Sequence, residues 1–168
     1  KLRTCYWWYL PSVQELVDMY NNLKVGGLGW FEEDYYWSST ESSSIYAYIV
    51  SMINGSYPYP GGYKSTGYRV RPVRHFSTAH NYGLGSQSNS NGFISYKSDN
   101  GDGTWLYYEC SEFDRPIPPS HVWSNVTDVA VTGTSANRGT GYINTSLIMT
   151  QAGHTDSAAK HAYDYTYD

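Results

Sequence analysis

Apolar and polar positions first take a helical period near the start of the chain. From Ser12 to about Lys24 they repeat every three to four residues, which predicts an amphipathic helix. Ser12 followed by Glu15 forms a capping box at its start, and the glycine pair Gly26-Gly27 ends it. The buried face should hold Val13, Leu16, Val17, Tyr20 and Leu23, and the solvent face Asp18, Asn21 and Asn22.

The pattern then changes to a period of two, which predicts strands. Residues 35–39 form a short core strand, 40–44 a turn, 45–53 a second strand and 67–76 a third, near an edge or bulge because of Pro72. Asn54-Gly55 reads as a hairpin turn. In the loop before the first strand, Trp30 and Phe31 are expected to be exposed. The arginines of the third strand, Arg69, Arg71 and Arg74, are expected to point outward.

Residues 77–92 are rich in Ser, Asn and Gly without apolar periodicity, which predicts a flexible linker. Residues 93–110 then read as a hairpin that turns at 99–103. Residues 122–131 read as extended chain, 145–152 as a helix capped by Asn144, and 155–165 as another helix. The whole chain, 1–168, is expected to form one α+β domain with small antiparallel sheets and two or three helices.

The strand at 45–53 does not keep its apolar residues on one face. Tyr48, Val50 and Met52 alternate as a buried face should, but Ile49 and Ile53 fall on the face that should be polar. A turn-rich, tyrosine-rich run follows at 55–63. One face of this segment is suited to folding and the other to contact with a ligand. The alternative is that Ile49 and Ile53 pack under the loop at 57–63.

Composition favours a secreted or surface domain. Tyr (19) and Trp (6) account for much of the hydrophobic content, and charged residues make up only 15%. Antibody binding loops share this bias, because tyrosine gives contact area at low entropic cost. The net charge of −4 argues against a nucleic-acid partner. No apolar run is long enough to span a bilayer, and no secretory signal is recognisable, so we expect a mature or trimmed product.

No catalytic, metal or cofactor site is expected from the sequence. Cys5 and Cys110 could form one disulfide or remain two buried thiols. The run Asp99-Asn100-Gly101-Asp102-Gly103 lacks the later Glu of a calcium loop and reads better as a hairpin turn. The histidines have no ligand spacing, and no serine lies in a nucleophile elbow. An enzyme is therefore the least favoured function.

Three motifs carry a family resemblance. They are Trp8-Tyr9-Leu10-Pro11-Ser12 with Glu15-Leu16, then Tyr36-Trp37-Ser38-Ser39-Thr40-Glu41, and then Tyr68-Arg69-Val70-Arg71-Pro72-Val73-Arg74. In this order over about 70 residues they resemble a bacterial and phage family with the C-type lectin-like fold. That family includes the variable proteins of diversity-generating retroelements. The calcium-dependent sugar motifs of the wider superfamily are missing, which argues against calcium-dependent sugar binding.

The two halves stand in exchanged order relative to this family. Residues 93–168 resemble the family's N-terminal half and residues 1–76 its C-terminal half, with 77–92 as the new connection. The resemblance thus implies a circular permutant, whose natural ends lie close because the first and last strands of the fold are neighbours. A tandem array cut out of register, or a domain-swapped chain, is the alternative.

The resemblance also implies a set of ligand-binding positions. In diversified members, Asn codons mutated at adenines commonly give Tyr, Ser, Ile, Thr, Gly or Asp. The positions reachable in this way are Ile45, Tyr46, Ile49, Ser51, Ile53, Asn54, Ser56, Tyr59 and Tyr63. Tyr48, Val50, Met52 and Gly55 fall where the family keeps its scaffold.

We therefore expect a non-enzymatic recognition domain at a cell or virion surface. Its partner would be a protein or glycan on another cell, with protein favoured because exposed isoleucines suit an apolar pocket better than a sugar. The alternative is an adhesion or structural module of a surface filament or phage tail that self-associates through the same face.

Overall fold

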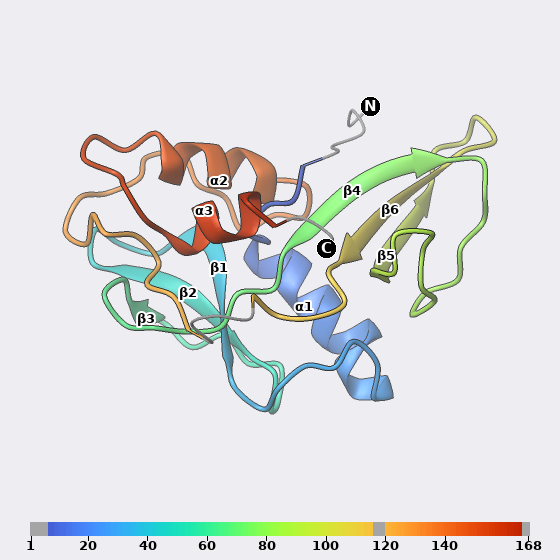
Figure 1. Ribbon diagram of the computed structural model, residues 1–168, viewed down its shortest axis with the longest axis horizontal. Coiled ribbons are helices and arrows are strands. Elements are labelled where there is room, and N and C mark those ends of the chain that lie inside the picture. Colours follow the sequence, from blue (N-terminus) through green and yellow to red (C-terminus); the bar gives the residue numbers. More distant parts are fainter. Residues whose placement is uncertain (1–6, 116–119, 166–168) are drawn as a thin grey trace.

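A computed structural model describes residues 7–115 and 120–165 (Figure 1). The strands form two three-stranded antiparallel sheets, ordered β1-β2-β3 and β4-β6-β5, which confirms the α+β class. The helices are α1 (Val13–Asn22), the 3-10 turn η1 (Lys24–Gly26), α2 (Gly141–Met149) and α3 (Ala158–Tyr163). The strands are β1 (Tyr35–Glu41), β2 (Tyr46–Ser51), β3 (Gly62–Tyr63), β4 (Val73–Thr78), β5 (Phe93–Asp99) and β6 (Trp105–Cys110). Within the described ranges, no helix has the length and apolar character needed to cross a bilayer.

Helix α1 begins as the sequence predicts. The Ser12 backbone N–H donates to Glu15 Oε2 at 2.7 Å, and the Glu15 N–H donates to Ser12 Oγ at 3.4 Å. The expected apolar face packs inward, with Leu16 and Leu23 fully buried. The prediction that Asp18 lies on the solvent face of α1 is wrong. Asp18 is buried because Arg138 donates to its carboxylate, with an Nη2 to Oδ1 distance of 2.8 Å.

Glu15 joins α1 to the chain that precedes α2. Its buried carboxylate also accepts a hydrogen bond from the Gly139 N–H at 2.8 Å. Burial raises the pKa of Glu15 from 4.5 to about 7, although the backbone N–H donors oppose this shift. The folded state therefore favours the protonated carboxyl, and its contribution to stability is full below pH 4.5 and is lost as the pH rises through 7.

Replacing Glu15 with Gln should remove this pH dependence. Wild-type protein is expected to lose up to about 3 kcal/mol relative to E15Q between pH 4.5 and 8, because only the wild-type side chain must ionise while buried. Urea unfolding of both proteins across this range measures the difference. His121 contributes the opposite pH dependence of stability to both proteins, because burial beside His161 lowers its pKa to about 4. Its contribution to stability is lost as the pH falls, and it is the same in wild type and E15Q. Parallel stability curves for the two proteins would contradict the assignment to Glu15.

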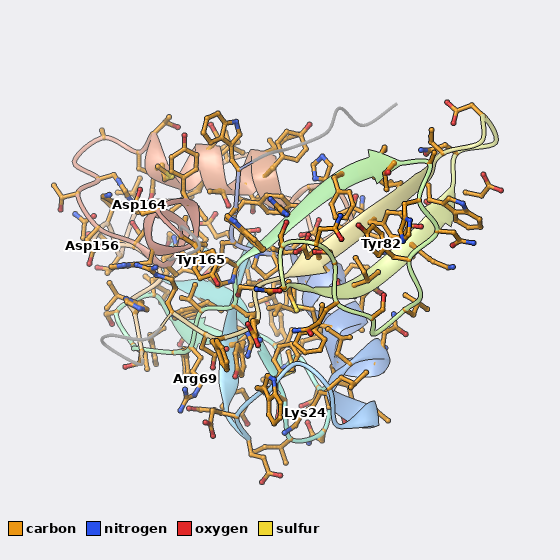
Figure 2. All side chains as sticks on the ribbon, turned by 45° about the vertical axis from the view of Figure 1, so that its right-hand side comes forward. Lys24, Arg69, Tyr82, Asp156, Asp164 and Tyr165 are labelled. Atoms are coloured by element: carbon orange, nitrogen blue, oxygen red, sulfur yellow. The ribbon has the colours of Figure 1, made fainter. Side chains whose placement is uncertain are left out.

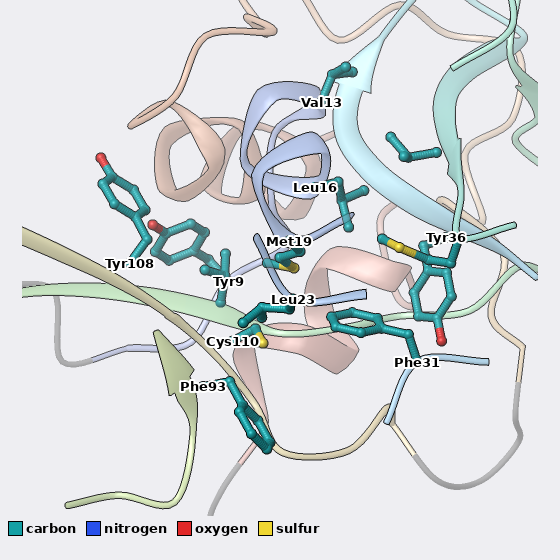
Figure 3. Close-up of a cluster of buried hydrophobic side chains, with 13 residues drawn as sticks. Tyr9, Val13, Leu16, Met19, Leu23, Phe31, Tyr36, Phe93, Tyr108 and Cys110 are labelled. Atoms are coloured by element: carbon teal, nitrogen blue, oxygen red, sulfur yellow. The ribbon is translucent and has the colours of Figure 1, made fainter. Parts of the chain in front are cut away.

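Two hydrophobic clusters hold the layers together. The first packs α1 against residues of both sheets and includes Leu16, Tyr36, Tyr108 and Cys110 (Figure 3). The second lies between the first sheet and helices α2 and α3. Its centre is a pair of buried tryptophans whose indole N–H groups are satisfied by backbone carbonyls. Trp37 donates to His121 O and Trp123 to Ser38 O, each at 2.7 Å.

The second sheet confirms the predicted hairpin. Strands β5 and β6 pair from Phe93↔Cys110 to Asp99↔Trp105. The Asp99 carboxylate accepts the Gly101 N–H at 2.8 Å, and the Asp102 carboxylate accepts the Thr104 N–H at 3.1 Å. Both acidic side chains therefore cap the turn itself, in agreement with the hairpin interpretation of residues 99–103.

The segment at 77–92 is not the loose linker that its composition suggested. It begins inside β4 and then folds back along β5, where the Gly85 N–H donates to Ile94 O at 2.9 Å and the Ile94 N–H donates to Ser86 O at 3.0 Å. Ser88 Oγ also donates to the buried carboxylate of Glu109 at 2.8 Å. The resemblance implied that β5 and β4, as the first and last strands of the family order, are neighbours. In the structure β6 lies between them and pairs with both.

Helix α2 begins earlier than predicted. Asn144 is not its cap but a buried residue of its first turns, whose amide donates to Ser135 O at 2.7 Å and accepts the Ser135 N–H at 3.0 Å. It therefore holds the preceding loop rather than the helix start. Helix α3 lies within the predicted range, with Ser157 as its cap and its alanines buried. Residues 122–131 form only an isolated bridge, Ser124↔Ser157, rather than extended chain.

The outward position predicted for Arg71 is wrong. Strand β4 begins only at Val73, so the alternation expected across 67–76 does not apply. Arg71 is fully buried, with Nε 2.6 Å from Asp114 Oδ1 and its guanidinium 4.1 Å from the Phe31 ring centre. Phe31, expected to be exposed, is therefore buried, whereas Trp30 is exposed. Arg69 lies at the surface (Figure 2), partly exposed as predicted.

Cys110 lies in the core at the end of β6. Burial raises the pKa of its thiol to about 11, so in the reduced form Cys110 stays protonated at neutral pH. Cys5 lies outside the described residues, and a Cys5–Cys110 disulfide stays a prediction.

Candidate ligand-binding face

Seven of the nine predicted ligand-binding residues lie at least partly at the surface. They lie along β2, the turn after it and the loop to β3, and Tyr59 is 80% exposed. Tyr57, which the sequence reasoning left out, is exposed in the same loop. The signal for Tyr57 was the tyrosine-rich run itself. We define the tyrosine face as Ile45, Tyr46, Ile53, Asn54, Ser56, Tyr57, Tyr59 and Tyr63.

Ile49 and Ser51 do not belong to this face, and their predicted outward position is wrong. Their exposed fractions are 4% and 1%. Ile49 belongs to the core cluster around Trp37, and the Ser51 N–H donates to Ser56 O at 2.8 Å. Ile49 packs into one hydrophobic cluster and its neighbour Val50 into the other, so both faces of β2 are covered here and neither is polar. The alternative that both isoleucines pack under the loop at 57–63 is wrong for Ile53, which is 60% exposed, while Ile49 is buried in the core cluster.

A buried ion pair holds the loop that carries the tyrosines. Lys64, directly after β3, is fully buried and pairs with the Glu41 carboxylate at the end of β1. Its Nζ also donates to Val129 O at 3.1 Å and lies 4.7 Å from the centre of the Trp123 ring. Glu41 in turn accepts the Val131 N–H at 2.9 Å. The end of the loop is therefore attached to two separate segments of the scaffold.

Two glycines let the same loop lie close against the scaffold, Gly61 against β2 and Gly62 against the Tyr68 ring. Gly61 has φ +103°, and a Cβ there would lie 2.1 Å from Ala47 O. A Cβ on Gly62 would lie 2.4 Å from the Tyr68 ring. Side chains at these positions would push the loop away from the sheet. The close backbone contact directs the tyrosine side chains of the loop outward, where they are exposed.

The tyrosine face has two ends, which the loop between β2 and β3 connects. At one end Tyr46 and Tyr63 are directly opposed across β2 and β3, with ring centres 4.5 Å apart. A hydrogen bond to Tyr63 raises the pKa of Tyr46. At the other end Asn54 Oδ1 accepts the Ser56 N–H at 3.1 Å and its hydroxyl at 2.8 Å. The face thus offers aromatic rings, hydroxyls and two exposed isoleucines.

The described residues outside this face offer no catalytic arrangement that we recognise. Over 7–115 and 120–165, no group of three or more His, Cys, Asp or Glu is placed to hold a metal ion. Ser157 lies 2.8 Å from His154 Nε2, but Ser157 is fully buried and its Oγ caps α3. It is therefore placed to stabilise the helix rather than to attack a substrate.

Comparison of the chain with protein-family models, with curated proteins and with solved structures finds no match.

Proposed function

We propose that this chain is a non-enzymatic recognition domain that binds a protein on another cell surface through the tyrosine face. The carrying observation is the contrast between a fixed backbone and exposed side chains. The loop is attached through Lys64 and Gly61, while Tyr57, Tyr59 and Tyr63 extend into solvent. A preordered loop loses little entropy on binding, and exposed tyrosines give contact area with adaptable hydrogen bonds.

We further propose the C-type lectin-like family and a circular permutation of it. The motif order in the sequence suggests this, and two ring contacts support it. Trp7 stacks on Tyr163 with ring centres 6.1 Å apart, and Trp8 meets Tyr165 at 5.0 Å. The first and last described residues therefore lie side by side, as a chain that once ran from one into the other requires (Figure 1).

The tyrosine face also leads us to propose diversification by a retroelement, restricted to its exposed positions. Ile49 and Ser51 are set apart because their side chains face the protein interior. Large or polar replacements at these two positions would disturb packing. The proposed extracellular or virion-surface location follows from the same recognition role.

Replacing Tyr59 and Tyr63 together with serine should weaken binding to target cells by at least about 30-fold, as expected for the loss of aromatic anchors. Fluorescently labelled protein and flow cytometry on cells from the source environment measure this. Trp30→Ala is the matched control, because Trp30 is equally exposed but lies outside the tyrosine face. Protease treatment of the cells should abolish binding, whereas glycosidase treatment should not. Equal binding by the double variant would contradict the proposal.

A self-associating adhesion module is the second candidate, favoured by the position of β3. This strand is two residues long, lies at the edge of its sheet and pairs only with β2 among the described strands. Exposed Ile45 and Tyr63 lie beside this short edge strand and offer apolar contact area to a second copy. Sedimentation at increasing concentration distinguishes the two functions. A dimer lost in the tyrosine double variant would favour the module, and a monomer at all concentrations would favour the receptor-binding role.

A further inference from the structure

A pocket of about 330 Å³ lies where the first described residues meet α2 and α3. Its walls are unusually aromatic: Trp7, Trp8, Tyr9, Tyr142 and Tyr163 all line it. Trp7 and Tyr163 are nearly parallel, at 24°, whereas Tyr9 and Tyr142 meet edge to face at 66° with ring centres 6.3 Å apart. Five aromatic rings at different mutual angles therefore border one space. The pocket is built from different elements than the tyrosine face.

One face of α2 supplies the remaining wall. Tyr142, Ser146, Met149 and Thr150 follow helical spacing and line the pocket together. Within the described residues, this lining contains hydroxyl groups and a thioether but no carboxylate, amide side chain, ammonium, guanidinium or imidazole group. The polar groups available to a ligand are therefore few and uncharged.

This chemistry restricts the class of ligand. A sugar loses hydrogen bonds to water for each hydroxyl it buries, and carboxylates or amides that could replace these bonds do not line the described pocket. A quaternary ammonium group has no hydrogen-bond donors or acceptors to satisfy, and its charge is attracted by aromatic faces. The same ring cluster already holds one cation, because the Arg74 guanidinium lies 4.9 Å from the centre of the Trp8 ring.

We propose that this aromatic pocket binds a trimethylammonium group. The net charge of −4 favours a positively charged ligand. Arg74, the cation beside Trp8, is itself paired with Glu109, with Nη2 3.1 Å from Oε2. The rings would surround the methyl groups, and the α2 hydroxyls would face the rest of the molecule. A neutral ligand of the same shape would gain the apolar contact but not the cation–π attraction.

The test compares choline with its neutral isostere 3,3-dimethyl-1-butanol, using tryptophan fluorescence and calorimetry on the whole chain. Choline is expected to bind saturably and at least about ten-fold more tightly than the isostere. Trp7→Ala removes one aromatic wall of the pocket and should weaken choline binding at least about ten-fold. The variant should still fold, because Trp7 is 64% exposed. Trp30→Ala, which removes another exposed tryptophan, should bind as wild type does.

Three results would overturn the proposal: equal binding of choline and its isostere, no saturable binding of choline, or unchanged binding by Trp7→Ala. Tyr163→Leu provides a second variant that keeps an apolar wall while removing a π face, and it should also weaken choline binding. Vesicles of phosphatidylcholine distinguish the source of the group. Co-sedimentation that Trp7→Ala abolishes identifies a lipid headgroup, and choline binding without co-sedimentation identifies a soluble ligand.

Discussion

Replacing Arg71 with methionine is expected to lower the free energy of unfolding by about 3–5 kcal/mol. The guanidinium is fully buried and donates to Asp114 Oδ1 at 2.6 Å. It also donates to the carbonyl oxygens of Gly29 at 2.7 Å, and of Ser111 and Glu112 at 2.9 Å. Methionine has a similar length but no donors. The variant would leave several carbonyls and Asp114 Oδ1 without Arg71, while Tyr36 and Arg69 still donate to Oδ2.

The matched control for this variant is Arg69→Met. Arg69 pairs mainly with Asp34, which is about half exposed, and reaches Asp114 only at 3.4 Å, so this loss should stay below about 1 kcal/mol. Urea unfolding of the two variants at one pH gives both values. If Arg71→Met and Arg69→Met were equally stable, Arg71 would not hold the loop before β1 against the loop after β6.

Replacing Lys64 with methionine is expected to cost about 3 kcal/mol or more, because it leaves the Glu41 carboxylate largely buried without its cation. A double-mutant cycle with Glu41→Gln tests this reason. The double variant should be more stable than the sum of the single losses predicts, because neither charge is then left alone. Lys160→Met, in an exposed pair with Asp164, should cost less than about 0.5 kcal/mol.

The Lys64 variant should also loosen the tyrosine face. Loss of the Lys64 ammonium releases the loop from Glu41 and Val129. Backbone amides of residues 57–64 should therefore exchange with deuterium faster than in the wild type, whereas the exchange of α1 amides should be unchanged. Additive losses in the cycle, together with unchanged exchange in the loop, would show that the buried ion pair does not position this face.

Local signals in the sequence were sufficient for several elements. The capping box of Ser12 and Glu15 placed the start of α1, and the turn residues at 99–103 placed the β5–β6 hairpin. These features depend on neighbours within a few residues. Trp37 and Val50 were also correctly expected in the core, because each lies in a short run with strand periodicity.

Long-range contacts explain what the sequence did not reveal. Charged residues are seldom fully buried, so nothing local marked Arg71 or Lys64, whose partners Asp114 and Glu41 lie far along the chain. Ile49 was misplaced because the covering of β2 on both sides is a property of the tertiary fold. The aromatic pocket combines Trp7, Tyr142 and Tyr163 from distant segments, and no single motif contains them.

Deep sequencing of the coding region for residues 35–76 across the source population tests the central claim most directly. Our account predicts substitutions concentrated at the exposed positions Ile45, Tyr46, Ile53, Asn54, Ser56, Tyr59 and Tyr63, with the buried Ala47, Ile49, Val50 and Met52 unchanged. Such a pattern would identify the tyrosine face as a diversified binding surface. Uniform sequences, or substitutions spread equally over buried and exposed positions, would contradict it.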